Sequence, residues 1–333
     1  MSLNLASFAG MAVSSYMLFT ATLSGEISAG TFAAVYSALG TVFSIMENIV
    51  TTHLGNMNKD MGKAANFIRV MDMPERTGAG GSVDLSKGIA VENIRFTYPG
   101  GERPSIEDVS LTIADGETIA IVGENGAGKS TLVRLLIGVY RPQTGRVTVG
   151  GLDTAKIAPG CVFKHTSAVF QKYQRYKMTL KENIAISDAE SAVDETKMDA
   201  SLKDIGAELE TGWDTMLSPE FGGIDLSGGQ WQHIAIARGL YRTHGFIILD
   251  EPTSSIDPVE ETRIYQQFKQ ISVGKCAVIV THRLGSAKLA NRIIVMDKGK
   301  IVAAGTHDDL LLQSEKYFKM WEAQAKWYKN ETE

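Results

Sequence analysis

The sequence predicts an α/β domain with a substantially parallel sheet, preceded by a hairpin of two membrane helices. Three observations support this fold class. Residues 1–46 contain a single charged side chain, Glu26. Beyond residue 88, β-rich runs alternate with helical runs, which is typical of a parallel sheet. A glycine-rich phosphate-binding pattern stands between a strand-like run and a helix-like run.

The composition allows a sizeable core and excludes some partners. The chain has 333 residues, of which 44% are hydrophobic, and a formal net charge of −5. Its length allows about two to three domains. The negative charge gives no support for a nucleic-acid partner. Cys161 and Cys276 lack metal-ligand spacing and are expected to be reduced core residues.

Two uncharged runs predict membrane helices at about residues 3–23 and 27–46. The first, LNLASFAGMAVSSYMLFTATL, spans roughly 31 Å at about 1.5 Å per residue, which matches one bilayer core. Lys59, Lys63 and Arg69 follow the second run, so both ends are expected on the cytoplasmic side of the cell membrane. The alternative is a pair of buried helices in a soluble protein, because Ser, Thr and Tyr dilute both runs.

Three segments are therefore expected. Residues 1–73 form the membrane part, whose second helix extends into the cytoplasm until Pro74. Residues 74–88 contain ERTGAGGSVDLSKG and are expected to be a flexible linker. Residues 89–333 form the α/β domain.

Short β-rich runs within residues 89–333 predict eight strands, and four helices are expected between or after them. The expected strands are Ile89–Phe96, Val109–Ile113, Thr118–Val122, Val147–Val149, Ala168–Phe170, Phe246–Asp250, Ala277–Thr281 and Ile293–Asp297. The expected helices follow Gly128, Leu226, Asp257 and Thr306.

The segment IAIVGENGAGKSTLVRLL carries the strongest signal. Residues 123–130 fit G-x-x-x-x-G-K-[ST], with a buried strand before them and a helix after them, as this motif requires. The glycines let backbone N–H groups surround a polyphosphate. Lys129 would then reach the β and γ phosphates, and Ser130 would ligate Mg²⁺.

The segment FIILDE places two acids at the end of an apolar strand. Asp250 is in position to hold Mg²⁺ through water, and Glu251 is the natural general base for a water that attacks the γ-phosphate. Such a pair of acids can also be a solvated turn. The presence of a phosphate loop in the same chain favours the catalytic interpretation.

Five motifs, GENGAGKST, LSGGQ, IILDEP, SSID and VTHR, occur in this order, and the region from about Val91 to Gly305 resembles the nucleotide-binding domain of ABC transporters. The hairpin and long helix before it resemble the last two membrane helices of an ABC exporter half. SGGQWQ and LDEP are similar to exporters of bacterial peptides such as lantibiotics. The resemblance implies a P-loop NTPase fold of the ABC type with a helical subdomain, ATP and Mg²⁺ as cofactors, and ATPase activity.

The resemblance also implies roles for individual residues. Tyr98 would stack on adenine, although a strand-end aromatic is the plain reading. Gln171 would sense Mg²⁺, with nearby Gln174 leaving the register open, and His282 would contact the γ-phosphate rather than cap a core turn. Catalysis is implied for Glu251, His282 and Gln171, and Mg²⁺ contacts for Ser130, Gln171 and Asp250. Nucleotide contacts are implied for Tyr98, Gly123, Glu124, Asn125, Gly126, Ala127, Gly128, Lys129, Ser130, Thr131, Ser227, Gly228, Gly229, Gln230 and Asp257.

The segment DLSGGQWQ is a second glycine-rich helix start without a lysine. In the family that it resembles, Ser227, Gly229 and Gln230 cap the γ-phosphate of ATP held by another copy, and Asp257 lies across the dimer interface. A second half-transporter, in a homodimer or a heterodimer, is therefore the expected partner.

These features predict the ATP-driven motor part of an exporter in the cell membrane, in contact with lipid and with an exported substrate such as a peptide. An exporter half usually carries more membrane helices than the two predicted here. Truncation of the reading frame before Met1 is favoured over a separate polypeptide that supplies the rest. The alternative functions are a non-transport or importer-type ABC ATPase, or a fragment that hydrolyses ATP without transport.

Overall fold

The computed structural model describes residues 2–49, 55–207, 209, 211–251 and 258–330. It divides into two compact units, Met1–Glu75 and Arg76–Glu333. Each unit is described by itself.

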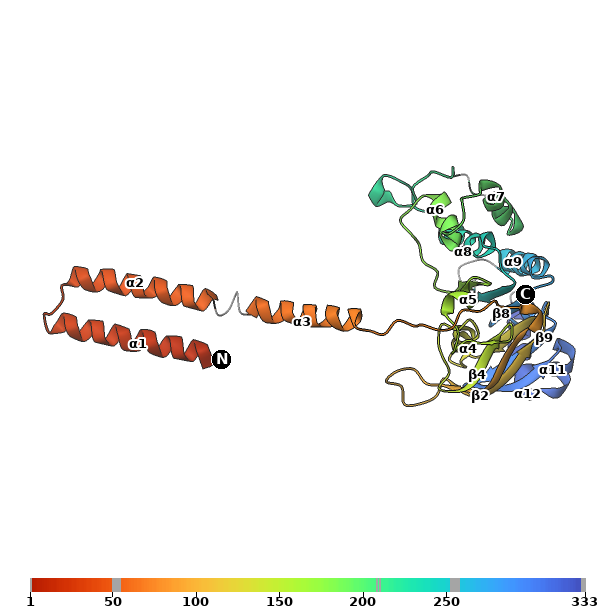
Figure 1. Ribbon diagram of the computed structural model, residues 1–333, viewed down its shortest axis with the longest axis horizontal. Coiled ribbons are helices and arrows are strands. Elements are labelled where there is room, and N and C mark those ends of the chain that lie inside the picture. The colour runs from red at the N-terminus through yellow and green to blue at the C-terminus, as the bar shows by residue number, and fades with distance from the viewer. Residues whose placement is uncertain (1, 50–54, 208, 210, 252–257, 331–333) are drawn as a thin grey trace. The chain divides into compact units, whose positions relative to one another are not determined.

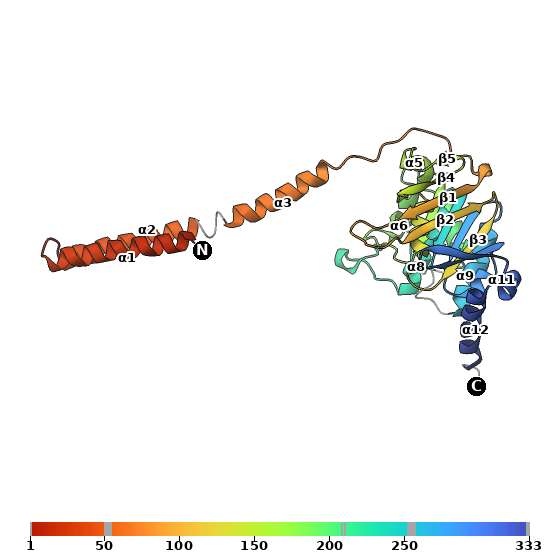
Figure 2. The same ribbon diagram turned by 90° about the horizontal axis from the view of Figure 1, so that it is seen from below.

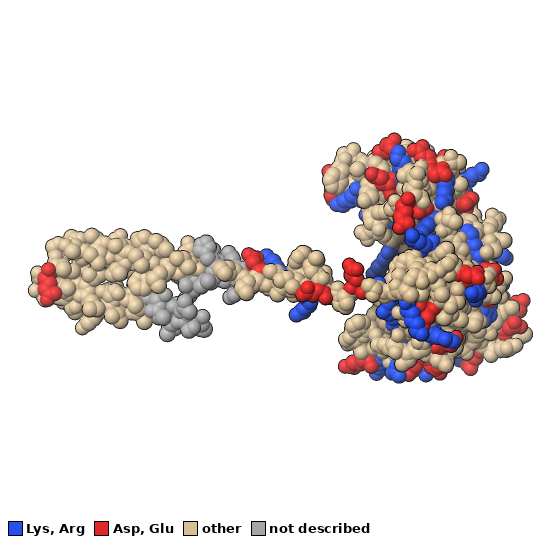
Figure 3. Space-filling model, in the orientation of Figure 1, with Lys and Arg blue, Asp and Glu red and all other residues tan. Residues whose placement is uncertain are grey.

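The first unit contains an apolar helical hairpin. Helices α1 (Ser2–Leu23) and α2 (Ala29–Asn48) lie side by side, and Ser28 caps the start of α2 by accepting from the Thr31 N–H (Figures 1 and 2). Residues 2–46 of the hairpin carry one charged side chain, the acid Glu26 at the turn (Figure 3). A third helix, α3 (Gly55–Met71), follows, and the link between α2 and α3 lies outside the described residues.

By length and composition, one helix among the described residues could cross a membrane. It is the segment Ala29–Met46 of α2, with a mean hydropathy of 1.5 and none of its residues fully buried within the protein. Helix α1 contributes a shorter apolar stretch, Phe8–Leu23. Both helices expose large apolar side chains, such as Phe8 and Ile45, which is costly in water and favourable in lipid.

The second unit is built on two sheets. A four-stranded antiparallel sheet has the order β2-β1-β4-β5, and a six-stranded sheet has the order β10-β9-β3-β8-β7-β6. The strands from β9 to β6 are parallel, and β10 pairs antiparallel with β9. The strands are β1 (Ile89–Phe96), β2 (Ile106–Ile113), β3 (Thr118–Gly123), β4 (Thr144–Val149), β5 (Leu152–Asp153), β6 (Thr166–Phe170), β7 (Phe246–Asp250), β8 (Cys276–Val280), β9 (Arg292–Asp297) and β10 (Lys300–Gly305).

Some helices of the second unit cover the sheets, and others form a separate group. They are α4 (Lys129–Leu136), α5 (Pro159–Phe163), α6 (Leu180–Ala185), α7 (Glu195–Asp204), α8 (Gly228–Tyr241), α9 (Pro258–Ile271), α10 (Leu284–Ala287), α11 (His307–Gln313) and α12 (Glu315–Asn330). Helices α6, α7 and α8 pack together, away from β2 and β4, in an apolar cluster that they share with α9 and with one face of β6, β7 and β8 (Figure 1).

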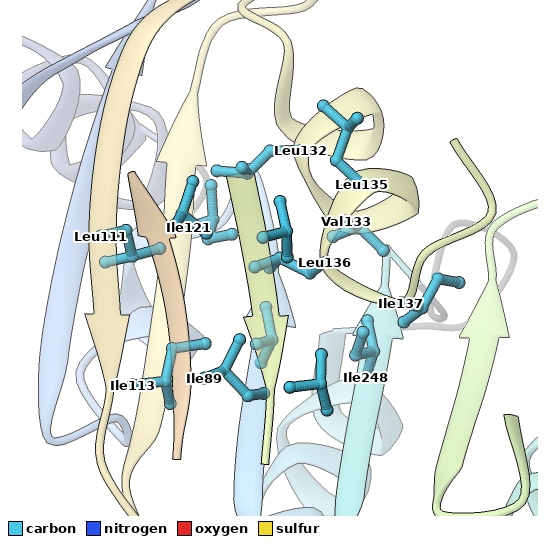
Figure 4. Close-up of a cluster of buried hydrophobic side chains, with 14 of the residues drawn as sticks. Ile89, Leu111, Ile113, Ile121, Leu132, Val133, Leu135, Leu136, Ile137 and Ile248 are labelled. Atoms are coloured by element: carbon cyan, nitrogen blue, oxygen red, sulfur yellow. The ribbon is translucent and has the colours of Figure 1, made fainter. Parts of the chain in front are cut away.

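The largest core lies between the two sheets, around α4. Leu132, Leu135 and Leu136 of α4 are fully buried in a cluster that contains side chains from both sheets, including Ile89 of β1 and Ile248 of β7 (Figure 4). Burying a side chain of this size contributes about 1.5–3 kcal/mol. This core fixes the position of the helix that follows the phosphate-binding pattern.

The glycine-rich segment before β1, expected to be flexible, is held against the second unit. The Arg76 guanidinium donates to the carbonyl oxygens of Gly138, Val139 and Thr154. Ala79 pairs with the backbone on both sides of Ile157. We call residues 76–83 the strap. The strap contacts mostly backbone groups, and such contacts do not require particular side chains. Its glycine-rich composition is therefore similar to that of a flexible linker.

Replacing Gly78 in the strap with alanine is expected to destabilise the second unit by about 1–3 kcal/mol, because overpacked sites cost this much. A Cβ atom there would lie 2.3 Å from the carbonyl carbon of Ile157. Gly80→Ala is the matched control, since a Cβ atom at Gly80 meets nothing within 4 Å. Thermal unfolding and the rate of subtilisin cleavage within residues 76–88 measure the difference. Equal behaviour of the two variants would show that the strap is not held at Gly78.

Candidate functional site

The phosphate-binding pattern forms a tight loop between β3 and α4. Gly126 and Gly128 have φ angles of 81° and 99°, which favour glycine. A Cβ atom at Gly128 would lie 2.6 Å from the carbonyl oxygen of Ser105, and one at Gly123 would lie 2.4 Å from that of Met296. Contacts within the chain therefore require glycine at positions 123 and 128, and the backbone angle favours it at position 126. The loop directs the first N–H groups of α4 outward.

Lys129, the first residue of α4, is only 6% exposed. Its Nζ donates to the carbonyl oxygens of Gly123, at 2.9 Å, and Glu124, at 3.2 Å. It also lies 3.5 Å from Oε1 of Glu251. The ammonium is thus held at the mouth of the loop, where a phosphate would meet it.

Asp250 ends the buried strand β7 and faces the loop. Its carboxylate accepts a hydrogen bond of 3.1 Å from Oγ of Ser130. Burial raises the pKa of Asp250, and the Ser130 hydroxyl opposes this by favouring the charged form. Hydroxyl and carboxylate oxygens are hard ligands of the kind that Mg²⁺ prefers alongside phosphate oxygens, so this pair fits a magnesium ion.

Glu251 has a strained backbone and two cationic or polar neighbours. Its φ angle of 48° is unusual for a residue other than glycine and is typical of functional positions. Oε1 lies 3.7 Å from Nδ1 of His282. The hydrogen bond from His282, together with the Lys129 charge, lowers the pKa of Glu251 against the opposing effect of burial. Glu251 is therefore ionised at neutral pH.

Glu251 and His282 line one cleft of about 870 Å³, and Lys129 lies beside it through its contact with Glu251. Gln171 follows β6 and lines the cleft, whereas Gln174 lines a different hollow between β6 and α8. The geometry thus favours Gln171 over Gln174 for a role beside Glu251 and His282. The cleft is lined by Gly123, Glu124, Asn125, Gln171, Glu251, His282, Lys316, Lys319, Met320, Ala323 and Gln324.

Tyr98 lies two residues beyond β1 and is half-buried. Phe96 and Tyr140 meet its ring edge-on, with interplanar angles of 82° and 86°. Its hydroxyl lies 3.1 Å from Oγ1 of Thr131, in the first turn of α4. Tyr98 is therefore both a packed aromatic and a neighbour of the phosphate loop.

The second glycine-rich helix start lies at the beginning of α8. Ser227 accepts from the Gln230 N–H, and the Gln230 side chain accepts from the Ser227 N–H, which makes a complete capping box. A Cβ atom at Gly228 or at Gly229 would meet nothing within 4 Å beyond the helix's own backbone. The glycines of this segment, unlike those of the phosphate loop, are not required by packing within the chain.

The described residues that line the cleft do not include Ser227, Gly228, Gly229 or Gln230. Asp257, expected at a dimer interface, lies outside the described residues. Helix α12, whose side chains form one wall of the cleft, was not expected from the sequence. Its signal is the aromatic spacing of Tyr317, Trp321 and Tyr328, which follows a helical period.

A parallel sheet with a phosphate loop, paired acids at the next strand and a second glycine-rich helix start defines an ABC-type ATPase domain. Residues 106–254 match the family model described as ABC transporter. The chain therefore belongs to the ABC transporter family through this ATP-binding domain, which confirms the resemblance seen in the motifs.

The relatives of the chain are transport proteins. The subtilin transport ATP-binding protein SpaT of Bacillus subtilis is 33% identical, over 94% of this chain and 53% of its own length. The nisin transport ATP-binding protein NisT of Lactococcus lactis subsp. lactis is 34% identical, over 70% and 40%. The ATP-dependent lipid A-core flippase of Pseudomonas fluorescens is 32% identical, over 96% and 53%. The chain spans about half the length of the relatives that match most of it.

A solved structure of an exporter is similar in fold to this chain. The structure of a bacterial Atm1-family ABC exporter with ATP bound matches 97% of this chain and 58% of its own chain, with a TM-score of 0.70 and 26% identity. The match includes the N-terminal helical region, so the similarity to exporters extends beyond the ATP-binding domain.

Proposed function

We propose that the chain is the ATP-hydrolysing part of an ABC exporter and acts with a second half-transporter in the cell membrane. The observation that supports this most is the cleft in which Glu251, His282 and Gln171 lie together next to Lys129. The apolar hairpin ahead of the ATPase domain favours transport over a non-transport ABC ATPase, and its fusion to that domain argues against an importer subunit.

In this proposal the loop 123–131 binds the phosphates of ATP. Its N–H groups and Lys129 neutralise the phosphate charge, and Tyr98 stacks on the adenine. Ser130 and Asp250 hold Mg²⁺, with Gln171 nearby, and the ion supplies positive charge at the β and γ phosphates.

Hydrolysis is assigned to the acid of the cleft. Glu251 is ionised and accepts the proton of the attacking water, while His282 orients that water against the γ-phosphate. Nζ of Lys129 lies 3.5 Å from the Glu251 carboxylate and helps to lower the pKa of Glu251. This effect weakens once the ammonium turns toward phosphate. The base strength of Glu251 would rise at that moment.

The second helix start completes the site of another copy. Ser227, Gly229 and Gln230 would meet the γ-phosphate bound to the partner, with Asp257 at the same interface. The open space around Gly228 and Gly229 supports this, because a phosphate or a partner backbone needs close approach at a helix N-terminus. Two copies then bury two nucleotides between them.

The cargo is assigned only by class. The relatives named for subtilin and nisin transport support a peptide, whereas the lipid A-core flippases favour a lipid. Both cargo classes are consistent with an exporter that faces the bilayer.

Alkaline washing of cell membranes tests the membrane part of the proposal. The full chain is expected to stay in the pellet, because the exposed apolar surface of α1 and α2 holds it in lipid. Val35→Lys, in the middle of the apolar segment of α2, is expected to reduce retention, since a central lysine costs about 2.5–3.5 kcal/mol. Val273→Lys, an exposed valine of the second unit, is the matched control. Complete release of the unmodified chain would contradict the exporter proposal.

A further inference from the structure

Helix α12 packs against the two elements that carry the phosphate loop and His282. Tyr317 is fully buried and shares an apolar cluster with Ala120 and Val122 of β3, which leads into the phosphate loop. The same cluster contains Leu284 and Ala287 of α10, which begins directly after the His282 segment. One helix therefore fixes both elements through a single core.

Helix α12 also makes polar contacts with the phosphate loop and with the segment that carries His282. Nζ of Lys316 lies 3.0 Å from a carboxylate oxygen of Glu124, in the phosphate loop, and 3.1 Å from one of Asp297, at the end of β9. Two turns further along α12, Gln324 reaches the backbone around His282.

The Gln324 amide contacts that backbone at two groups that flank Arg283, directly after the His282 side chain. Its Oε1 accepts the N–H of Leu284 at 2.9 Å, and its Nε2 donates to the carbonyl oxygen of His282. A side-chain amide offers a donor and an acceptor at any pH, whereas a carboxyl of the same length does so only when it is protonated. The His282 ring is 54% exposed, so packing does little to fix it and its position depends on its backbone.

We propose that Gln324 is a positioning residue for His282, holding the segment 282–284 so that the imidazole faces Glu251 and the bound nucleotide. This inference rests on the proposed ATPase function of the cleft. Gln324 acts through His282, so its loss lowers turnover and leaves the phosphate contacts of Lys129 in place.

The test uses the full chain with Gln324→Met, which keeps the length of the side chain and removes both hydrogen bonds. Turnover at saturating ATP is expected to fall about tenfold, and the KM for ATP to change less than about twofold, since two hydrogen bonds of ordinary strength are lost. Gln313→Met is the matched control, because Gln313 is exposed at the end of α11.

Two further measurements separate positioning from general destabilisation. In a His282→Ala background, Gln324→Met is expected to cost nothing further, because the residue through which it acts is gone. Hydrogen exchange at the Leu284 N–H is expected to accelerate in Gln324→Met and to stay slow in Gln313→Met. Gln324→Glu keeps only the acceptor, and its turnover relative to the unmodified chain is expected to rise as the pH falls and its carboxyl gains a proton.

Additive losses in the double variant, or unchanged exchange at Leu284, would overturn the assignment of Gln324. A full chain without any ATPase activity would instead contradict the proposed function. The exchange measurement needs no turnover and therefore still decides the role of Gln324 in that case.

Discussion

Replacing Glu251 with glutamine is expected to lower ATP turnover by a factor of about 100 to 10,000, the usual contribution of a general base. Glutamine has the same shape, but its amide cannot accept the proton of the attacking water. ATP binding is expected to tighten, because a negative charge 3.5 Å from Nζ of Lys129 is removed from the neighbourhood of the phosphates. Steady-state phosphate release and the binding of a fluorescent ATP analogue measure the two effects.

Glu107→Gln is the matched control for this substitution. Glu107 lies on β2 and pairs with Lys300 at the surface, so its loss leaves the cleft unchanged. The variant that binds ATP without hydrolysing it is also expected to accumulate as a dimer in size-exclusion chromatography with ATP. Hydrolysis by Glu251→Gln at a rate close to that of the unmodified chain would eliminate Glu251 as the base.

A mixture of two inactive variants is expected to recover ATPase activity. Lys129→Ala removes the phosphate ammonium, and Ser227→Arg places a bulky cation on the second helix start. If each site combines the loop of one copy with the Ser227 segment of another, a mixed dimer keeps one intact site. Equal mixing makes half of the dimers mixed, so recovery to roughly a quarter of the unmodified rate is expected.

The geometry of the Ser227 segment makes this prediction sharp. A side chain at position 227 is exposed and lies outside the cleft that the phosphate loop of the same chain forms. Each variant alone is the control and should be inactive. Mixing two preparations of the same variant should recover nothing. Absence of recovery in the mixed sample, with mixed dimers verified by differently tagged copies, would place both halves of the site within one chain.

Local sequence patterns predicted those elements of the fold that consecutive residues form. The strand Thr118–Val122, the loop and the helix after Gly128 follow one another directly, so one motif fixed all three. The separation of the strands into two sheets was not predicted, because β1 pairs with β2 and β4 through contacts distant in sequence. Composition alone does not distinguish an antiparallel β1 from a parallel β3.

The contacts of Arg76 and Gln324 could not be predicted for a related reason. Arg76 binds carbonyl oxygens 62 to 78 residues away, and Gln324 contacts a backbone about 40 residues before it. Almost every residue type offers the same backbone groups, so the sequence does not indicate which of them a side chain contacts. The groups that we propose for catalysis were easier to predict, because Lys129, Glu251 and His282 each follow an apolar strand and the parallel sheet brings the carboxyl ends of strands to one edge.

The strap has a mechanical consequence for the nucleotide. Arg76 holds the carbonyl oxygens of Gly138 and Val139, which lie just beyond the last turn of α4, while Lys129 occupies the first turn of the same helix. A helix of this length is a stiff rod of about 12 Å. We therefore expect a displacement of Arg76 to act on one end of this helix, whose other end carries the ammonium that we propose meets the phosphates.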